Sequence, residues 1–367
     1  MNDETDPVLP SPEPSDDEPP SSWKRQIRNR IETVEDLRPF IDLTGDEERF
    51  FTETPGCKLS VTPYYMGLVA NDPTGSLRRC TIPTFHENIV DPRTESQDSL
   101  DEEHYRHGCV IHRYPDRALF LSTSFCSVYC RYCTRSRMIS CHGTTTERDL
   151  IDGGLDYIRS TPSISDVIVS GGDPLTLDDG ILESILSRLR DIPHVKMIRI
   201  GTKVPAVLPM RITDNLVQML RKYRPLWINI HFTHPAELTD GCRDACMRLS
   251  DAGIPLFSQT VLLKGVNDDP KILSKLFKRL LEFNVKPYYI YHCDSVVGTS
   301  HFRTTIKRGL EIMGELQGSI SGYAIPQYIY DIPGGGGKVP LVSTQWSIEE
   351  DKFTVRNFEG RTFRCEI

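Results

Sequence analysis

Three closely spaced cysteines are the residues of this sequence best suited to chemistry. Cys126, Cys130 and Cys133 lie within eight residues of one another. Three thiolates on one short loop can bind three irons of a [4Fe–4S] cube, which leaves the fourth iron without a protein ligand. An open coordination position is typical of reactive metal sites, whereas structural sites are closed. A structural zinc loop completed by His142 is the alternative.

A lysine that follows four glycines is the second reactive candidate. Gly334 to Gly337 lead directly into Lys338. The stretch lacks the Ser or Thr that follows the lysine of a phosphate-binding P-loop. A lysine on a flexible arm suits a reversible imine with a carbonyl cofactor such as pyridoxal 5′-phosphate (PLP), because it must swing away when a substrate amine replaces it. An ordinary surface loop is the alternative.

The elements between these motifs alternate regularly. Apolar, often β-branched runs predict strands over residues 118–121, 167–170, 195–200, 226–231, 256–262 and 287–291. Amphipathic stretches predict helices over residues 147–160, 179–190, 213–223, 236–252, 270–283 and 303–316. This alternation predicts a parallel α/β fold, and six units indicate an incomplete (βα)6 barrel rather than a closed eight-stranded one. Ligands should bind where the strands end.

Several polar residues follow the expected strands at that end. The cysteine loop comes directly after the first strand, and Gly171-Gly172-Asp173 comes after the second. Two adjacent glycines let the backbone approach a ligand closely, although a plain turn between strand and helix has the same composition. Gln259 belongs to the fifth strand and Asp294 follows the sixth.

The chain divides into four expected parts. They are a disordered acidic tail (1–22), a helical N-terminal segment (23–108), the partial barrel (109–330) and the lysine arm with a short β extension (331–367). Residues 1–22 hold seven acids, six prolines and no Lys or Arg, a composition that cannot bury enough apolar surface to fold. Apolar residues at 27, 31, 34 and 37 recur at helical spacing in the N-terminal segment, and a hairpin is expected around Glu359-Gly360.

Charge and cysteine content exclude several classes of protein. The net charge is −8, and outside the tail 44 acids face 43 bases, which argues against a nucleic-acid-binding protein. No apolar run is long enough to span a membrane, so no membrane partner is expected. Eleven cysteines, an odd number, suit a reducing cytoplasm better than a secreted disulfide framework.

Both motifs and several further stretches resemble one family. The chain is similar to lysine 2,3-aminomutases, which are PLP-dependent enzymes of the radical S-adenosylmethionine (SAM) superfamily, over roughly residues 23–360. The spacing C-x3-C-x2-C is that of the superfamily. The other matching stretches are residues 23–35, Thr62-Pro63-Tyr64-Tyr65, residues 112–117, Ser170-Gly171-Gly172-Asp173, residues 231–235, residues 287–291, His301-Phe302-Arg303-Thr304 and the glycine–lysine arm.

The resemblance implies which residues hold the cofactors. SAM would bind the open iron of a [4Fe–4S] cluster on the three cysteines, and its further contacts would be Gly171, Gly172, Asp173 and Gln259. PLP would be held by Lys338, with Arg113, Tyr114 and Arg117 around it and its phosphate. Guanidinium groups pair well with phosphate. An ion pair with Asp116 is the alternative role for these arginines.

The resemblance also implies the substrate. Arg135 matches the family arginine that binds the substrate carboxylate, whereas Asp294 and Asp331 match the aspartates that hold the distal ammonium of lysine. Two carboxylates in one pocket favour a cation and disfavour glutamate. The expected activity therefore moves the 2-amino group of L-lysine to C3 and yields β-lysine. An arginine 2,3-aminomutase is the first alternative, and an enzyme that modifies a lysine on a protein is the second.

The same family implies further partners. These are a small-molecule amino acid substrate, an external electron donor of the flavodoxin or ferredoxin type, and a second copy of the chain in a homo-oligomer. A non-catalytic metal-binding protein derived from the same fold is disfavoured, because Lys338, Asp294 and Asp331 are all present.

Overall fold

The computed structural model describes residues 19, 22–54, 59–139, 148–342, 346–349, 352–356 and 359–366. The predicted disordered tail falls almost entirely outside this range, and so does His142 of the alternative zinc loop. Among the described residues, no helix has the length and apolar character needed to cross a membrane.

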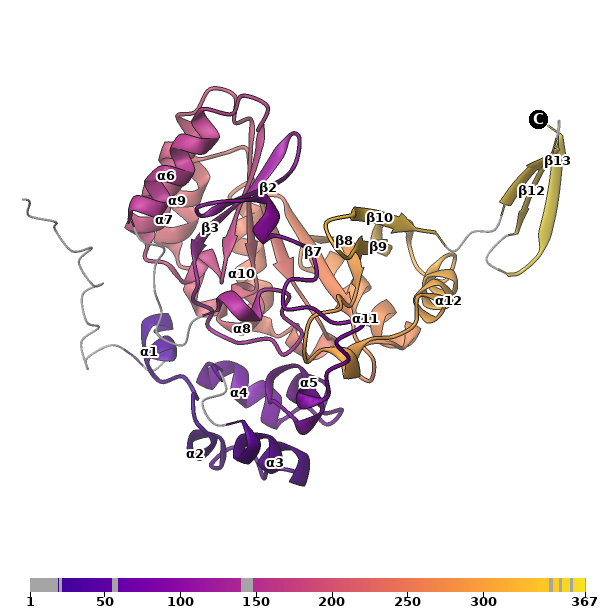
Figure 1. The fold of residues 1–367 in the computed structure, drawn as a ribbon, viewed down its shortest axis with the longest axis horizontal. Helices are drawn as coiled ribbons and strands as arrows, with labels where there is room; N and C mark the ends of the chain where they lie inside the picture. Colours follow the sequence, from indigo (N-terminus) through magenta and orange to yellow (C-terminus); the bar gives the residue numbers. More distant parts are fainter. Residues whose placement is uncertain are drawn as a thin grey trace, which may run out of the picture.

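One ten-stranded sheet forms the centre of the molecule (Figure 1). The strands lie side by side in chain order, and every neighbouring pair from β3 to β9 is parallel. The pairs β1–β2, β2–β3 and β9–β10 are antiparallel. The strands are β1 (Arg106–His107), β2 (Val110–Tyr114), β3 (Arg117–Thr123), β4 (Asp166–Gly171), β5 (Met197–Thr202), β6 (Leu226–His231), β7 (Leu256–Leu262), β8 (Val285–His292), β9 (Gln327–Ile332) and β10 (Gly337–Leu341).

A helix follows each of the first six parallel strands. The helices are α6 (Arg148–Arg159), α7 (Asp179–Arg190), α8 (Val204–Val207) with α9 (Asp214–Lys222), α10 (Asp240–Asp251), α11 (Pro270–Glu282) and α12 (Ile306–Leu316). The predicted α/β fold with a mostly parallel sheet is confirmed. The sheet is nevertheless larger than six strands, because β9 adds a seventh parallel strand beside β8, with Ile290 opposite Tyr328.

Local capping signals set the helix boundaries. The Thr213 hydroxyl accepts a hydrogen bond from the Leu216 backbone at the start of α9, and Thr239 caps α10 in the same way. A side-chain oxygen that accepts a hydrogen bond from a backbone N–H at the start of a helix stabilises the first turn. The helix predicted from residue 236 therefore begins only at Asp240, after a separate 3-10 turn over Pro235–Glu237.

The N-terminal segment consists of short helices that lie beneath the barrel in Figure 1. These are α1 (Trp23–Arg28), α2 (Val34–Leu37), α3 (Gly45–Glu53), α4 (Pro63–Ala70) and α5 (Ser76–Thr81). The helical spacing of apolar residues over 27–37 does not form one continuous helix. Ile31 instead exchanges two backbone hydrogen bonds with Val61, at 2.9 and 3.1 Å, and Thr33 caps a new helix. A tertiary contact thus overrides the helical spacing.

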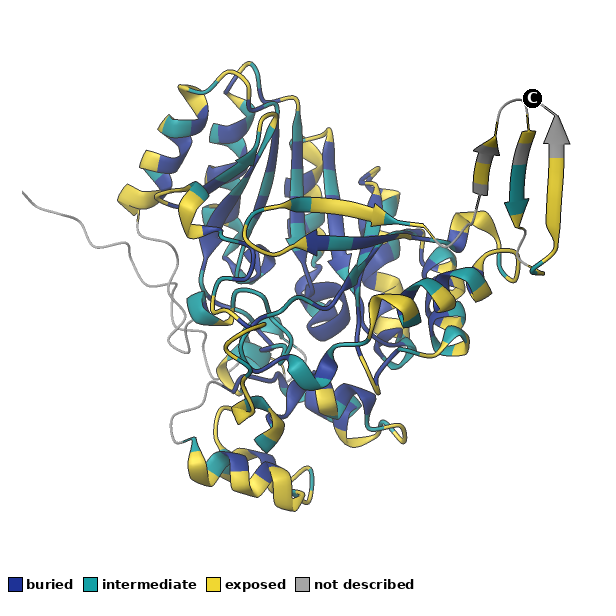
Figure 2. Cartoon of the chain, turned by 45° about the vertical axis from the view of Figure 1, so that its right-hand side comes forward, coloured by how far each residue is buried: buried dark blue, intermediate teal, exposed yellow. Residues whose placement is uncertain are grey.

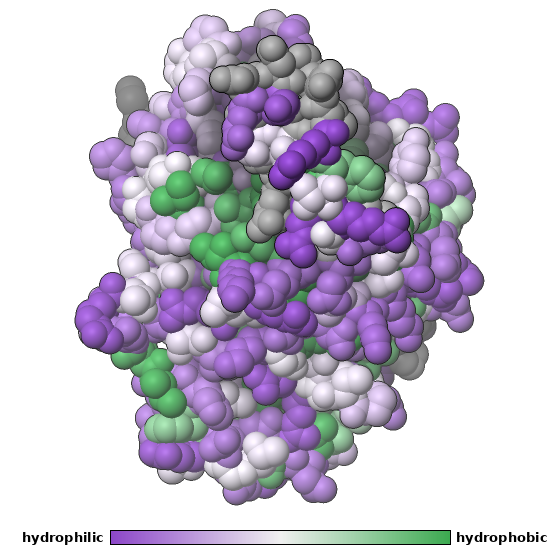
Figure 3. Space-filling model, turned by 90° about the vertical axis from the view of Figure 1, so that its right-hand side faces the viewer, coloured by the Kyte–Doolittle hydropathy of each residue, from purple (hydrophilic) through white to green (hydrophobic). Residues whose placement is uncertain are grey.

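Burial follows this arrangement. The parallel strands and the inner faces of the helices are buried, whereas the outer helix faces are exposed (Figure 2). On the face seen in Figure 3 the surface is mostly hydrophilic, and apolar side chains gather in small patches.

A small separate sheet ends the described chain and projects from the body in Figures 1 and 2. Its strands are β11 (Trp346–Glu349), β12 (Lys352–Arg356) and β13 (Thr362–Glu366). Arg356 pairs with Thr362 across the predicted hairpin.

Candidate active site

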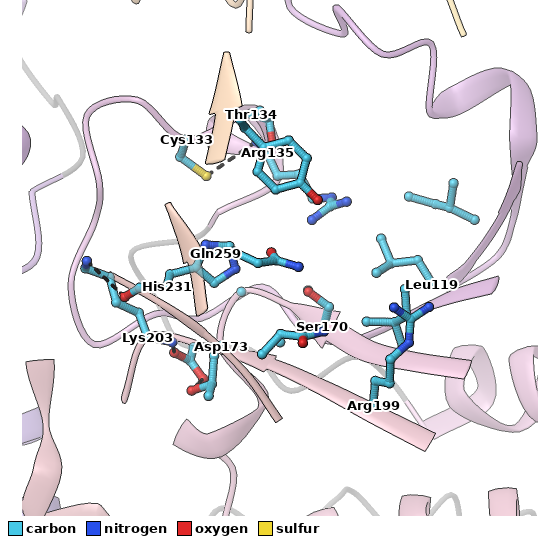
Figure 4. A pocket seen from close by; sticks show the side chains of 18 of the residues that line it. Leu119, Cys133, Thr134, Arg135, Ser170, Asp173, Arg199, Lys203, His231 and Gln259 are labelled. Atoms are coloured by element: carbon cyan, nitrogen blue, oxygen red, sulfur yellow. Dashed lines mark hydrogen bonds between the residues drawn. The ribbon is translucent and has the colours of Figure 1, made fainter. Parts of the chain in front are cut away.

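A cavity of about 560 Å³ runs through the open barrel, and the residues predicted to bind the cofactors and the substrate line it. Its walls also include side chains near the strand starts, such as Asp166 and Arg199, so it extends along the barrel interior. The predicted residues that line it are Arg113, Tyr114, Arg117, Cys126, Cys130, Cys133, Arg135, Gly171, Gly172, Asp173, Gln259, Asp294, Asp331 and Lys338. Figure 4 shows Gln259 pointing into the space between Arg135 and Ser170.

The cysteine loop follows β3 at the carboxyl end of the sheet. Burial raises the pKa of all three thiols, and burial together with the neighbouring Cys130 raises the pKa of Cys133 to about 11. Within the described part of the chain, no three His, Cys, Asp or Glu side chains are gathered tightly enough for a single metal ion. The three cysteines line one cavity, and three thiolates are the donors that a [4Fe–4S] cluster with one open iron takes, so the chemistry of the donor set fits such a cluster.

The glycines after β4 hold this loop in position. The Gly172 N–H donates to the Thr123 carbonyl at 2.5 Å, and the Asp173 N–H donates to the Phe125 carbonyl at 2.7 Å. A Cβ at residue 171 or 172 would overlap these same backbone carbonyls, and Gly171 has φ +126°. Close packing of two backbones therefore explains both glycines, without a ligand being required.

Asp173 is engaged within the protein. Its carboxylate accepts hydrogen bonds from the Thr202 hydroxyl at 2.6 Å and from the backbone of Lys203 and Leu175 at 2.7 and 3.2 Å. These bonds tie the loops after β4 and β5 together. Its predicted role as a SAM contact stays a prediction, as does that of Gln259.

Lys338 stands on β10, directly opposite Asp331 on β9. Gly334 and Gly335 in the turn between the two strands, and Gly337 at the start of β10, have positive φ. The Lys338 Nζ lies 3.0 Å from an Asp331 carboxylate oxygen and less than 6 Å from the ring centres of Tyr114 and Tyr291. Its backbone N–H donates to the Tyr114 hydroxyl at 3.1 Å. The arm thus directs the ammonium group into the cavity.

The arginines predicted to hold PLP already have acidic partners. Arg113 pairs with Asp331 at 3.1 Å, and its buried Nε has no hydrogen-bond partner among the described residues. Arg117 pairs with Asp116 at 2.9 Å, which was the alternative considered from the sequence. Arg117 also lies 4.0 Å from the centre of the Tyr114 ring. An anion entering here would meet two guanidinium groups and an aromatic face.

The three predicted substrate contacts lie around the same space. Arg135 is held by Glu102 through two hydrogen bonds of 3.0 and 2.6 Å. Burial, and next the charge of Asp331, raise the pKa of Asp294 to about 7, against an ordinary value of 3.8. A buried carboxylate with a raised pKa favours a cationic partner.

The structure adds residues that the sequence did not single out. Lys203 is buried at the end of β5, and its ammonium donates to Glu237 at 2.6 Å and to Thr233 at 3.2 Å. Its position just after a strand was a usable signal. Burial, and next the charge of Lys203, lower the pKa of His231 to about 4. Glu102 also lines the cavity, and no local pattern distinguished it.

Comparisons with known proteins agree with these features. A family model of the Radical SAM superfamily matches residues 120–276, and one of lysine-2,3-aminomutase matches residues 313–364. L-lysine 2,3-aminomutase of Clostridium subterminale is 45% identical over 93% of this chain and 82% of its own length. The Bacillus subtilis L-lysine 2,3-aminomutase is 44% identical, over 93% of this chain and 73% of its own length.

A relative named for another amino acid is also similar. Glutamate 2,3-aminomutase of Clostridioides difficile is 41% identical over 94% of this chain and 82% of its own length. The matches extend over nearly the whole chain and include both the barrel and the lysine arm. The chain is therefore an isomerase of the radical SAM lysine 2,3-aminomutase family.

Proposed function

We propose that this protein converts L-lysine to β-lysine by moving the amino group from C2 to C3, with a [4Fe–4S] cluster, SAM and PLP as cofactors. The observation that carries the proposal is a shared cavity. Its lining includes the three cysteines, the glycine-arm lysine, Arg135 and two carboxylates, Asp294 and Asp331. When bound, the cluster with SAM would supply the radical that takes hydrogen from C3, and PLP would supply the ring that carries the migrating amino group.

The protein's own contribution begins with binding of the cofactors. Cys126, Cys130 and Cys133 would bind three irons, and the charge of those irons would stabilise thiolates that burial otherwise disfavours. Lys338 would hold PLP, because its ammonium already points into the cavity beside two tyrosine rings. Arg113 and Arg117, which line the same cavity, would meet the phosphate.

Substrate orientation would come from opposite charges at two places. Arg135 would bind the α-carboxylate, while Asp294 and Asp331 would bind the distal ammonium. Asp331 now pairs with Lys338 at 3.0 Å. Attachment of PLP would take the Lys338 nitrogen out of this ion pair, and Asp331, still paired with Arg113 at 3.1 Å, would turn its other oxygen to the substrate. Fixed charges inside such a cavity act more strongly than they would in bulk solvent.

The same carboxylates argue against glutamate, although a glutamate 2,3-aminomutase is among the relatives. A second carboxylate on the substrate would meet Asp294 and Asp331 and be repelled. Arginine remains the alternative substrate, because a guanidinium can pair with two carboxylates. An external electron donor of the flavodoxin or ferredoxin type would reduce the cluster.

The experiment is anaerobic incubation of reconstituted protein with SAM, a reductant, PLP and L-lysine, followed by chromatography of the products. We expect β-lysine, and none when SAM or the reductant is left out. Cleavage of SAM without formation of β-lysine would refute the proposed substrate while leaving the radical chemistry in place.

A further inference from the structure

A segment outside the barrel, residues 95–105, crosses the end of the cavity where the candidate substrate contacts lie. Near its start it lies beside the loop after β8. The Ser96 N–H donates to the Ser295 carbonyl at 3.1 Å, and the Val297 N–H donates back to the Ser96 carbonyl at 3.2 Å. This exchange fixes the segment next to Asp294, one of the two carboxylates proposed to bind the distal ammonium.

The middle of the segment contacts the lysine arm. The Ser99 carbonyl accepts a hydrogen bond of 2.9 Å from the Gly334 N–H. The Tyr105 ring packs so closely on Gly335 that a Cβ at that position would lie 3.1 Å from the ring. The segment therefore also fixes the turn between Asp331 and Lys338.

The end of the segment holds Arg135. Glu102 receives hydrogen bonds from the Nε and Nη2 atoms of Arg135 at 3.0 and 2.6 Å, and its side chain is only 8% exposed. A second guanidinium, that of Arg137, lies 3.8 Å from the same carboxylate. Two parallel hydrogen bonds fix the plane of a guanidinium as well as its position. Within the described chain, the remaining nitrogen of Arg135, Nη1, has no hydrogen-bond partner, so it is left for another anion.

We propose that residues 95–105 set the length of substrate that the cavity accepts, and that Glu102 is the positioning residue that sets where Arg135 meets the α-carboxylate. The inference rests on the proposed function. One segment contacts the neighbours of Asp294, Asp331 and Arg135, so it fixes the span between the carboxylate-binding end and the ammonium-binding end. A shorter side chain at position 102 moves Arg135 and changes that span.

The first test removes the charge of Glu102 and keeps its shape. Glu102→Gln should weaken L-lysine binding, measured by calorimetry, about 10- to 100-fold, because the charge-assisted hydrogen bonds to Arg135 are lost. Its KM should rise far more than its kcat falls. L-lysinamide, which lacks the carboxylate, should bind the variant and the wild type equally. The control is Glu53→Gln, which removes a similar partner from Arg49 on α3, where the Nε–Oε1 distance is 2.7 Å.

The second test changes the span itself. Glu102→Asp should change the ratio of kcat/KM for L-homolysine, which is one methylene longer, to that for L-lysine by about tenfold. The inference would be overturned if Glu102→Gln bound L-lysine as tightly as the wild type and Glu102→Asp kept the wild-type ratio of the two kcat/KM values. So would equal weakening of lysine and lysinamide, because that points to a general structural defect. A wild type that fails to convert lysine would instead refute the proposed function.

Discussion

At the cysteine end of the cavity the chain is held by backbone hydrogen bonds, whereas at the lysine end it is held by ion pairs between side chains. Gly172 packs against the backbone of the cysteine loop through a hydrogen bond to Thr123. At the other end, Asp331 pairs with both Arg113 and Lys338. The cysteine end thus depends on the shape of the packed backbone. The lysine end depends on which charged groups are present.

This difference has a functional consequence. Backbone packing has a single arrangement, which suits a cluster that stays in place. Ion pairs can exchange partners, which suits a site where a lysine must release its carboxylate to an incoming ammonium. Changes at the cysteine end should therefore abolish SAM cleavage, whereas changes at the lysine end should leave the cluster in place and alter PLP attachment, affinity, specificity or pH dependence.

The largest effect should come from the cysteines. Cys130→Ala should lose the bound iron and all reductive cleavage of SAM, because two thiolates cannot hold the cube in its place. Iron analysis and 5′-deoxyadenosine formation measure the two losses. The control is Cys246→Ala, which removes a buried thiol on α10 away from the cavity. Normal SAM cleavage by Cys130→Ala would refute the proposed radical SAM site.

Replacing the arm lysine should abolish covalent attachment of PLP without affecting the cluster. Lys338→Ala should no longer be labelled when PLP is fixed by borohydride, while its iron content stays at the wild-type level. Peptide mass spectrometry locates the label, and the exposed Lys307 serves as the control when changed to alanine. A label on any other lysine of the wild type would show that the arm has a different role.

A single methyl group should disturb the cysteine end. Gly172→Ala places a Cβ against the Phe125 carbonyl, and such overpacking costs about 1–3 kcal/mol. We expect reduced iron incorporation and a lower melting temperature. Gly180→Ala is the control, since a Cβ there meets nothing within 4 Å. Equal iron content in the two variants would show that the glycine contact does not position the loop.

The smallest effect is a pH dependence at the lysine end. Asp294 has a pKa of about 7, so L-lysine affinity should rise by up to about tenfold per unit as pH increases toward 7, and level off above it. Calorimetry from pH 5.5 to 8.5 measures this, and Asp294→Asn should abolish the slope.

Stability should change in the opposite direction. The folded pKa of Asp294, about 7, exceeds its ordinary value of 3.8, so the fold loses stability as pH rises from 3.8 to about 7, and its stability is level above that pH. Without substrate, Asp294→Asn should therefore melt at a higher temperature than the wild type at pH 8, and the difference should shrink at pH 5. If the melting temperatures of the two proteins depended on pH in the same way, the titrating group would be a residue other than Asp294.

The sequence predicted the cysteine end more completely than the lysine end, for a physical reason. Cys126, Cys130 and Cys133 and the glycines after β4 lie in short local motifs, and the alternation of strands and helices fixes where those motifs meet. Glu102 acts across 33 residues on Arg135, so no local spacing indicates the pair. The pairing of Ile31 with Val61 was hidden for the same reason. The expected boundary between the barrel and the lysine arm falls inside β9, so the seventh parallel strand was not predicted.

The most direct test of the account is a competition assay. Equal concentrations of L-lysine, L-arginine and L-glutamate are incubated together with the reconstituted protein, SAM and reductant, and the three β-amino acids are quantified by mass spectrometry. We predict that β-lysine dominates and that β-glutamate is nearly absent, because Asp294 and Asp331 favour a cation. Predominant β-glutamate would contradict the account, since it would mean that these carboxylates do not contact the distal end of the substrate.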